Sequence, residues 1–338
     1  MVKTKYRNYY EILCQNYPEW LDEYIQTPAM QKQAGISMTC GTIYTDLFPD
    51  SGFYTSLDHS IGVALIVWNF THDKKQALAG LFHDIATPAF KHCVDFMNGD
   101  YMTQESTEEL TTKMIEDSPE IMKLLQRDGI KVPEVDNYHL YPIADNDTPQ
   151  LSADRLEYSL SNPAFVYPLK TLEQIGNIYR DIEVQQNPEG ETELGFRTKT
   201  HARELVKLTS KLSVIYRDER TRYSMQLIAD ILRKMSEDGD ISVKDLYEKS
   251  EAEIIKSIEK SKYGKTFDTW RKAKKLQRSK TEPKGVYFVN HPAKIRYINP
   301  LYRGERISKQ CKIAAKAIEK NIAYDMDFYV FLPEIKPF

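Results

Sequence analysis

Two apolar segments, separated by a short polar break, dominate residues 58–95 of this 338-residue chain. Residues 58–70 read DHSIGVALIVWNF, with apolar side chains on every face of a helix. A helix that is apolar nearly all round is buried. The following ALAGLFHDIATPAFKHCVD predicts a second helix, which begins at about Lys75 and is ended by Pro88. The pattern therefore predicts two packed helices at the centre of the fold.

Both helices carry polar side chains where a purely structural helix would have leucine. His59 lies at the start of the first helix, and the adjacent pair His83-Asp84 lies near the end of the second. A buried charge without a partner is costly, so these groups must be paired or ligated. Imidazole nitrogens and carboxylate oxygens are donors that borderline divalent metals take. The pattern favours a metal site over polar core residues satisfied by hydrogen bonds.

Capping signatures predict the positions of several later helices. Candidate first residues or caps are Ser106 with Glu109, Ser152, Ser242 with Asp245, and Ser250 with Glu253. Residues 182–197 read as two short strands around a turn, and a long helical run follows from about Thr200 to Met235. The chain is therefore predicted to be mainly α-helical.

The C-terminal part of the chain differs in character from the rest. Residues 262–284 are strongly basic and then give way to VYFV, KIRYIN and DFYVFL, which predict strands, and to SKQCKIAAKAIEKN, which predicts a helix. We expect a helical domain over residues 1–261, with its core at 55–235, and a basic linker with a small α+β appendage over 262–338. Clustered cations attract phosphates, so nucleic acid or polyphosphate could bind at 262–284, but a solvated surface is the favoured interpretation.

Composition narrows the class of protein further. The net charge is −3, which gives no global attraction to nucleic acid or to a membrane surface. The cysteines show no CxxC spacing, which argues against a disulfide framework and a cysteine zinc site; they are Cys14, Cys40, Cys93 and Cys311. We expect a cytoplasmic protein with neither signal peptide nor membrane span, and self-association stays open.

Taken together, these positions resemble the HD superfamily of metal-dependent phosphohydrolases. The resemblance rests on HSIGVA at His59, HDIATPAFKH at His83 and DRLEY at Asp154, in that order. It is nearest to the dNTP triphosphohydrolase branch, which includes the SAM-and-HD-domain enzymes. It covers roughly residues 55–235, including YRDERTRYSMQLIAD. It implies an HD-type helical bundle.

The resemblance also implies roles for individual residues. One divalent metal ion (Mn, Fe, Ni, Zn, Co or Mg) would be held by His59, His83, Asp84 and Asp154. The resemblance matches Asp95 to a carboxylate near the metal centre. From their positions beside the His-Asp pair, we expect acid–base roles or orientation of water for Asp84, Asp95, His92 and Glu105. The substrate would be contacted by Lys91 and Arg155 at its phosphate, and by Tyr158, Asn162 and Tyr216 at its sugar.

Three positions depart from the pattern of the triphosphohydrolases. Thr87 and Gln104 stand where that branch has histidine, and Ser56 stands where it has arginine. We therefore predict a single-metal phosphohydrolase that cleaves a phosphoester of a nucleotide or related small molecule. The alternatives are a nucleotide-binding sensor that has lost catalysis, and a nuclease or cyclic-nucleotide phosphodiesterase.

Overall fold

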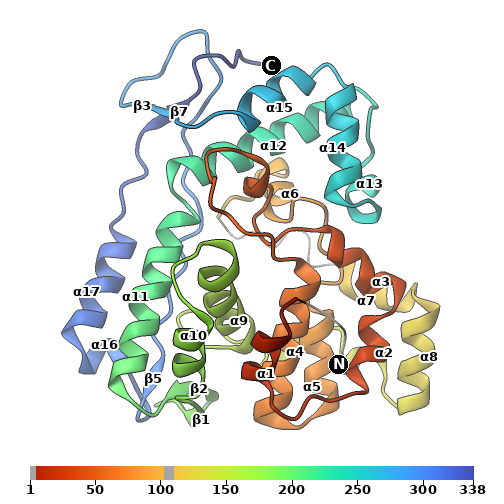
Figure 1. Cartoon of the computed structure of the whole chain (residues 1–338), viewed down its shortest axis with the longest axis vertical. Coiled ribbons are helices and arrows are strands. Elements are labelled where there is room, and N and C mark those ends of the chain that lie inside the picture. Colours follow the sequence, from red (N-terminus) through yellow and green to blue (C-terminus); the bar gives the residue numbers. More distant parts are fainter. Residues whose placement is uncertain (1–4, 103–109) are drawn as a thin grey trace.

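Helices make up most of the chain, as the computed structural model shows for residues 5–102 and 110–338 (Figure 1). The first helices are α1 (Arg7–Leu13), α2 (Leu21–Ile25), α3 (Pro28–Lys32), α4 (Ser56–Thr71), α5 (Lys74–Phe82), α6 (His92–Met97), α7 (Thr111–Glu116), α8 (Pro119–Asp128) and α9 (Ala153–Ser161). The later ones are α10 (Leu172–Tyr179), α11 (Lys199–Ile215), α12 (Glu219–Glu237), α13 (Val243–Glu248), α14 (Glu251–Lys260), α15 (Gly264–Arg271), α16 (Ile307–Gln310) and α17 (Lys312–Ile322).

Two small sheets accompany the helices. The strands are β1 (Ile182–Gln186), β2 (Thr192–Phe196), β3 (Gln277–Ser279), β4 (Phe288–Val289), β5 (Leu301–Tyr302), β6 (Glu305–Arg306) and β7 (Tyr329–Phe331). One sheet has the order β1-β2-β5-β6, and the other has the order β3-β7-β4. The prediction of a mainly α fold with a small α+β region at the C-terminal end is confirmed.

The central helix pair forms as the apolar pattern predicts. Helix α4 is capped by Thr55, whose hydroxyl accepts from the backbone of Asp58, and α5 packs along it. A Cβ added at Gly80 of α5 would lie 3.2 Å from a methyl of Val63 and 3.3 Å from one of Val67. A glycine at this position therefore lets the two helices approach closely. The contact lies in the core cluster that draws its residues from 6–206 and 298–318.

The second helix ends earlier than Pro88 predicts. Helix α5 stops at Phe82, so His83 and Asp84 lie just beyond its end. The next backbone carbonyls bind side chains from α3 and the turn after it: Lys32 Nζ donates to Thr87 O at 2.7 Å, and Gln33 Nε2 donates to Ile85 O at 2.6 Å. These tertiary hydrogen bonds replace the helical ones, which a local pattern cannot reveal.

The predicted long run from Thr200 to Met235 is two helices. Helix α11 ends at Ile215, and α12 begins at Glu219. Asp218 caps α12 by accepting from the backbone N–H groups of Arg220 and Thr221. An aspartate that binds the next backbone amides competes with a continuous helix, and this is the physical reason for the break.

Other local predictions have mixed outcomes. The caps at Ser152, Ser242 and Ser250 are present, and β1 pairs antiparallel with β2 over residues 182–196 as predicted. The cap at Ser106 lies outside the described residues. The segment KIRYIN at 294–299 forms no strand, so that prediction is wrong. Among the described residues, no helix is both long and apolar enough to cross a membrane.

The C-terminal segment packs closely on the helical body. Strand β5 extends the β1–β2 hairpin by pairing parallel to β2, and α17 packs against α11 (Figure 1). Strands β4 and β7 contact α12. A division of the chain at residue 262 stays a prediction, but hydrogen bonds and side-chain packing cross that position.

A fully buried carboxylate joins α14 to two loops. Glu251, the first residue of α14, accepts from the hydroxyl of Tyr44 at 2.7 Å and from the backbone N–H of Phe90 at 3.2 Å. Burial raises the pKa of Glu251 from 4.5 to about 7. Because the folded state holds this proton more tightly than the unfolded chain, ionisation opposes folding.

We predict that this group makes the free energy of unfolding fall as pH rises from about 4.5 to about 7. The shift of roughly 2.5 pKa units corresponds to a loss on the order of 3 kcal/mol, complete above the folded-state pKa. Urea denaturation of the wild-type chain and of Glu251→Gln, measured across this pH range, should give curves that diverge. Parallel pH profiles for the two proteins would contradict the prediction.

Candidate metal centre

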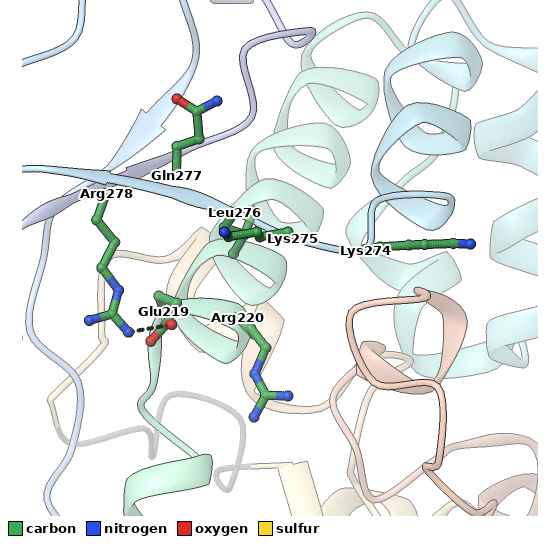
Figure 2. A pocket seen from close by; sticks show the side chains of 7 residues that line it. All are labelled: Glu219, Arg220, Lys274, Lys275, Leu276, Gln277 and Arg278. Carbon is green, nitrogen blue, oxygen red and sulfur yellow. Dashed lines mark ion pairs between the residues drawn. The ribbon is translucent and has the colours of Figure 1, made fainter.

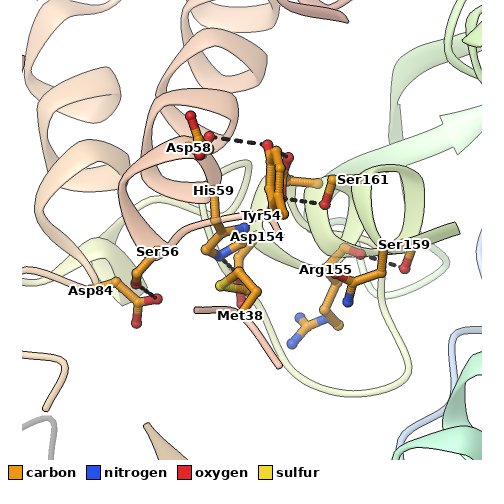
Figure 3. A network of polar contacts seen from close by, with 12 residues as sticks. Met38, Tyr54, Ser56, Asp58, His59, Asp84, Asp154, Arg155, Ser159 and Ser161 are labelled. Atoms are coloured by element: carbon orange, nitrogen blue, oxygen red, sulfur yellow. Dashed lines mark hydrogen bonds and ion pairs between the residues drawn. The ribbon is translucent and has the colours of Figure 1, made fainter. Parts of the chain in front are cut away.

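Three side chains from three parts of the chain meet at one point. His59 comes from the first turn of α4, His83 follows the end of α5, and Asp154 lies in the first turn of α9. Helix α4 packs against both α5 and α9, so helix packing brings these positions together. Figure 3 shows His59 and Asp154 side by side at this junction.

The distances between their donor atoms fit one metal ion. His59 Nε2 lies 3.1 Å from Asp154 Oδ1 and 3.2 Å from His83 Nε2, and His83 Nε2 lies 3.8 Å from Asp154 Oδ1. Two donors bonded to one divalent ion at about 2.0–2.3 Å lie roughly 3–4 Å apart. These residues form the group that could hold a metal, with all donors within 4.8 Å of one another.

Each histidine is oriented by a hydrogen bond from its other ring nitrogen. His83 Nδ1 donates to the carbonyl of Gly80 at 2.8 Å, and His59 Nδ1 donates to Glu157 Oε2 at 2.5 Å. With Nδ1 donating, the lone pair of Nε2 in each ring is available to a cation. Burial by itself would lower the pKa of His59. The carboxylates of Glu157 and Asp154 have the larger combined effect and raise this pKa to about 10 when no metal is bound.

Glu157 is the site residue that sequence reasoning missed. Its carboxylate has no exposed surface and accepts from Tyr54 at 2.7 Å, from Tyr9 at 3.1 Å and from Ser161 at 3.1 Å, besides His59. Glu157 follows Asp154 by three positions, which places both residues on one face of α9. That spacing was the available signal. A buried acid behind a ligating histidine is a recurrent feature of metal sites.

Asp84 stands beside the three donors rather than among them. Its Oδ2 lies 3.8 Å from His83 Nε2 and accepts from Lys91 Nζ at 2.6 Å and from Ser56 Oγ at 3.2 Å. Figure 3 shows this pairing with Ser56 to one side of His59. Although burial opposes ionisation, Lys91 and the two histidines hold the pKa of Asp84 well below its usual value. Asp84 is an ionised carboxylate at the edge of the site.

The predicted acid–base residues form a separate pair. Asp95 is fully buried and accepts from His92 Nδ1 at 2.8 Å, and both residues belong to α6. Neither belongs to the group of three donors. Glu105 and Gln104 lie outside the described residues. The roles of Asp95, His92 and Glu105 stay predictions.

The predicted phosphate contacts are already engaged within the chain. Lys91 binds Asp84, as described above. Arg155 donates to the backbone of Gln150 at 2.9 Å, contacts Asn146 and lies 3.3 Å from Asp145 Oδ1. At the departures from the family pattern, the Ser56 hydroxyl accepts from Lys91 Nζ at 3.2 Å, and the Thr87 carbonyl accepts from Lys32 Nζ at 2.7 Å.

The predicted sugar contacts lie together. Asn162 Nδ2 donates to the hydroxyl of Tyr216 at 2.7 Å, and Tyr158 and Tyr216 line one small cavity. Arg296, from the C-terminal segment, lines the same cavity and was not predicted. The cavity measures about 10 Å³, so a sugar ring requires these side chains to move apart.

A larger cleft of about 560 Å³ lies at the start of α12 (Figure 2). Its lining residues are Glu219, Arg220, Lys274, Lys275, Leu276, Gln277 and Arg278. Glu219 forms an ion pair with Arg278, and Arg220 pairs with Asp218 at 2.7 Å. This cleft shares no lining residue with the metal centre. Volume alone therefore does not identify the reactive site, and binding of nucleic acid at 262–284 stays a prediction.

Sequence comparison finds two relatives over part of the chain. The chain is 28% identical over 141 residues to the uncharacterised protein YdhJ of Bacillus subtilis, and 28% identical over 145 residues to a metal-dependent phosphohydrolase of Cordyceps militaris. Each match covers 41% of this chain, and 42% and 39% of the respective relative. The chain thus spans about two fifths of each relative's length. No protein-family model matches the sequence.

Solved structures resemble the whole fold. A hypothetical protein from Aquifex aeolicus aligns with a TM-score of 0.62 at 14% identity, covering 94% of this chain and 93% of its own. A phosphohydrolase from Bacteroides thetaiotaomicron aligns with a TM-score of 0.53 at 12% identity, covering 95% and 97%. At this identity the likeness concerns the fold. The fold is thus shared with a phosphohydrolase along nearly its full length.

We predict that Glu157→Gln weakens Mn²⁺ binding by about 10- to 100-fold, the usual cost of losing a partner of a ligating histidine. The amide is uncharged and leaves the imidazole of His59 a poorer donor to the cation. Isothermal titration with Mn²⁺ measures the change. Ser161→Ala is the matched control, because its hydroxyl binds the same carboxylate at 3.1 Å without touching His59. Equal Mn²⁺ affinities for Glu157→Gln and wild type would contradict the prediction.

Proposed function

We propose that this protein is a metal-dependent phosphohydrolase of the HD type. The observation that carries the proposal is the convergence of His59 Nε2, His83 Nε2 and Asp154 Oδ1 at 3.1–3.8 Å. Two imidazoles and a carboxylate make a donor set for a borderline divalent cation. Similarity to a metal-dependent phosphohydrolase of Cordyceps militaris supports the same activity.

Within this proposal, His59, His83 and Asp154 hold the cation, and Asp84 completes the set from its edge. When bound, the cation supplies Lewis acidity and lowers the pKa of a coordinated water. Lys91 keeps the Asp84 carboxylate ionised, so that it would accept a hydrogen bond from that water and orient it. Lys91 Nζ lies 2.6 Å from Asp84 Oδ2 and supplies a positive charge beside this carboxylate.

The substrate we propose is a nucleotide or related small phosphoester that carries few phosphates. Tyr158, Tyr216 and Asn162 offer aromatic faces and an amide to a sugar and base. The Arg155 guanidinium is held by internal acceptors, and Ser56 brings no charge. A triphosphate carries several charges that must be met in the transition state. We therefore expect the site to hydrolyse a nucleoside monophosphate more readily than it releases intact triphosphate from a nucleoside triphosphate.

We predict that a deoxynucleoside monophosphate is turned over faster than the triphosphate when Mn²⁺ is added. Product analysis by chromatography on both substrates, with phosphate and tripolyphosphate measured separately, makes the comparison. Rapid tripolyphosphate release would show that this protein acts as an ordinary dNTP triphosphohydrolase. Tight nucleotide binding without turnover of either substrate would favour a sensor.

A second prediction tests the metal site directly. Asp154→Ala should abolish Mn²⁺ binding and phosphate release while it leaves the helical circular dichroism spectrum intact, because apolar burial holds the helices together. Asp117→Ala, at an exposed position after α7, serves as the control and should behave as wild type. A fully active Asp154→Ala protein without bound metal would refute the proposed mechanism.

A further inference from the structure

A strained turn separates the metal centre from α6. Phe90 has φ +66°, and Lys91 has φ +46° with ψ −120°. Two successive residues with a side chain rarely adopt positive φ, because the Cβ atom then crowds the backbone. Such backbone persists only where the surrounding structure holds it. Contacts from other parts of the chain must therefore hold this turn in its conformation; we call these contacts the clamp.

The clamp comes from helices that lie about 150 residues later in the chain. The carbonyl of Leu246, in α13, accepts from the backbone N–H of Ala89 at 2.7 Å. Glu251, at the start of α14, accepts from the N–H of Phe90 at 3.2 Å. The Glu251 carboxylate has no exposed surface, and Tyr44 donates to its other oxygen at 2.7 Å. Two consecutive amides of the strained turn thus bind one helix pair.

The strained turn aims Lys91 at the metal centre. The side chain of Lys91 is 7% exposed, and its Nζ lies 2.6 Å from Asp84 Oδ2 and 3.2 Å from Ser56 Oγ. Lysine has a long flexible stem, so a fixed ammonium position depends on a fixed backbone. Lys91 is the next residue after Phe90, whose backbone N–H binds Glu251, so this hydrogen bond helps to fix the backbone at Lys91.

We propose that Glu251 is a positioning residue, which holds Lys91 against Asp84 by accepting the hydrogen bond of Phe90. Glu251 touches neither the metal donors nor Asp84 and acts through the turn. The inference deepens the proposed function and rests on it, because Lys91 matters only if Asp84 serves a metal centre. It adds a clamp from α13 and α14 to a site otherwise built from α4, α5 and α9.

Two substitutions separate the hydrogen bond from the charge. At pH 8, above the pKa of about 7, Glu251→Gln keeps an oxygen at the same distance from the N–H of Phe90 and removes the charge. Glu251→Asp keeps the charge and withdraws the oxygen by about one bond length. A role through the hydrogen bond predicts near-normal Mn²⁺ affinity for Glu251→Gln and a loss of about 10-fold for Glu251→Asp, typical of outer partners of metal ligands.

The coupling to Lys91 is tested by a double-mutant cycle on the full chain, with isothermal titration of Mn²⁺ as the readout. In a Lys91→Met background, Glu251→Asp should change Mn²⁺ affinity by less than about 2-fold, because residues that act through one another are not additive. A general loss of stability would instead lower affinity equally in both backgrounds. The same pair of substitutions at Glu248, which is exposed on α13, provides the matched control.

The outcomes distinguish this inference from the proposed function. Wild-type protein that binds no Mn²⁺ overturns both. Wild-type protein that binds Mn²⁺, with Glu251→Asp equal to Glu251→Gln or with an equal loss in the Lys91→Met background, overturns the positioning role alone. A loss confined to Glu251→Asp and abolished by Lys91→Met supports it.

Discussion

The arrangement of the central helices depends on one buried carboxylate. Glu157 lies inside the contact between α1, α4 and α9, where four side chains donate to it. A buried carboxylate without donors would be very costly, so these helices can pack only in the register that supplies them. Gly62 of α4 makes room, because a Cβ there would lie 2.7 Å from Glu157 Cγ. The same contact orients His59 toward the metal position.

The proposed function of this centre depends on which charged side chains are already paired within the chain. The positive groups that a phosphohydrolase could offer to a polyphosphate are engaged: Lys91 with Asp84, and Arg155 with the loop at residues 145–150. An engaged cation can still contact a phosphate, but it must share or lose its present partner. A small phosphoester requires less of this exchange than a triphosphate does. The proposed preference for a small phosphoester thus rests on these internal ion pairs.

The centre also depends on segments that are distant in the sequence. Helices α13 and α14 hold the turn at Phe90 and Lys91, and the C-terminal segment places Arg296 beside Tyr158. Contacts cross residue 262 between the helical body and the C-terminal region, and the division of the chain there stays a prediction. Similarity to solved structures over 94–95% of this chain agrees with a fold that extends over its whole length.

Local pattern predicted the central helices, most caps and the hairpin, because periodicity and capping act over a few residues. It also marked His59, His83 and Asp84 as candidate ligands, whereas Asp154 was expected only from the resemblance to the HD superfamily. The sequence did not reveal where α5 ends, why the run after Thr200 breaks, or that 294–299 forms no strand. The end of α5 depends on Lys32 and Gln33, whose side chains donate to carbonyls more than 50 residues away. The break before α12 comes from the cap at Asp218, which binds the next backbone amides. Tertiary packing alone decided that Glu157 orients His59, that Lys91 pairs with Asp84 and that Glu251 holds the strained turn. The contacts of Glu157 with His59 and of Glu251 with Phe90 join groups distant in the sequence. Lys91 and Asp84 are only seven residues apart, but their pairing depends on the turn that Glu251 contacts.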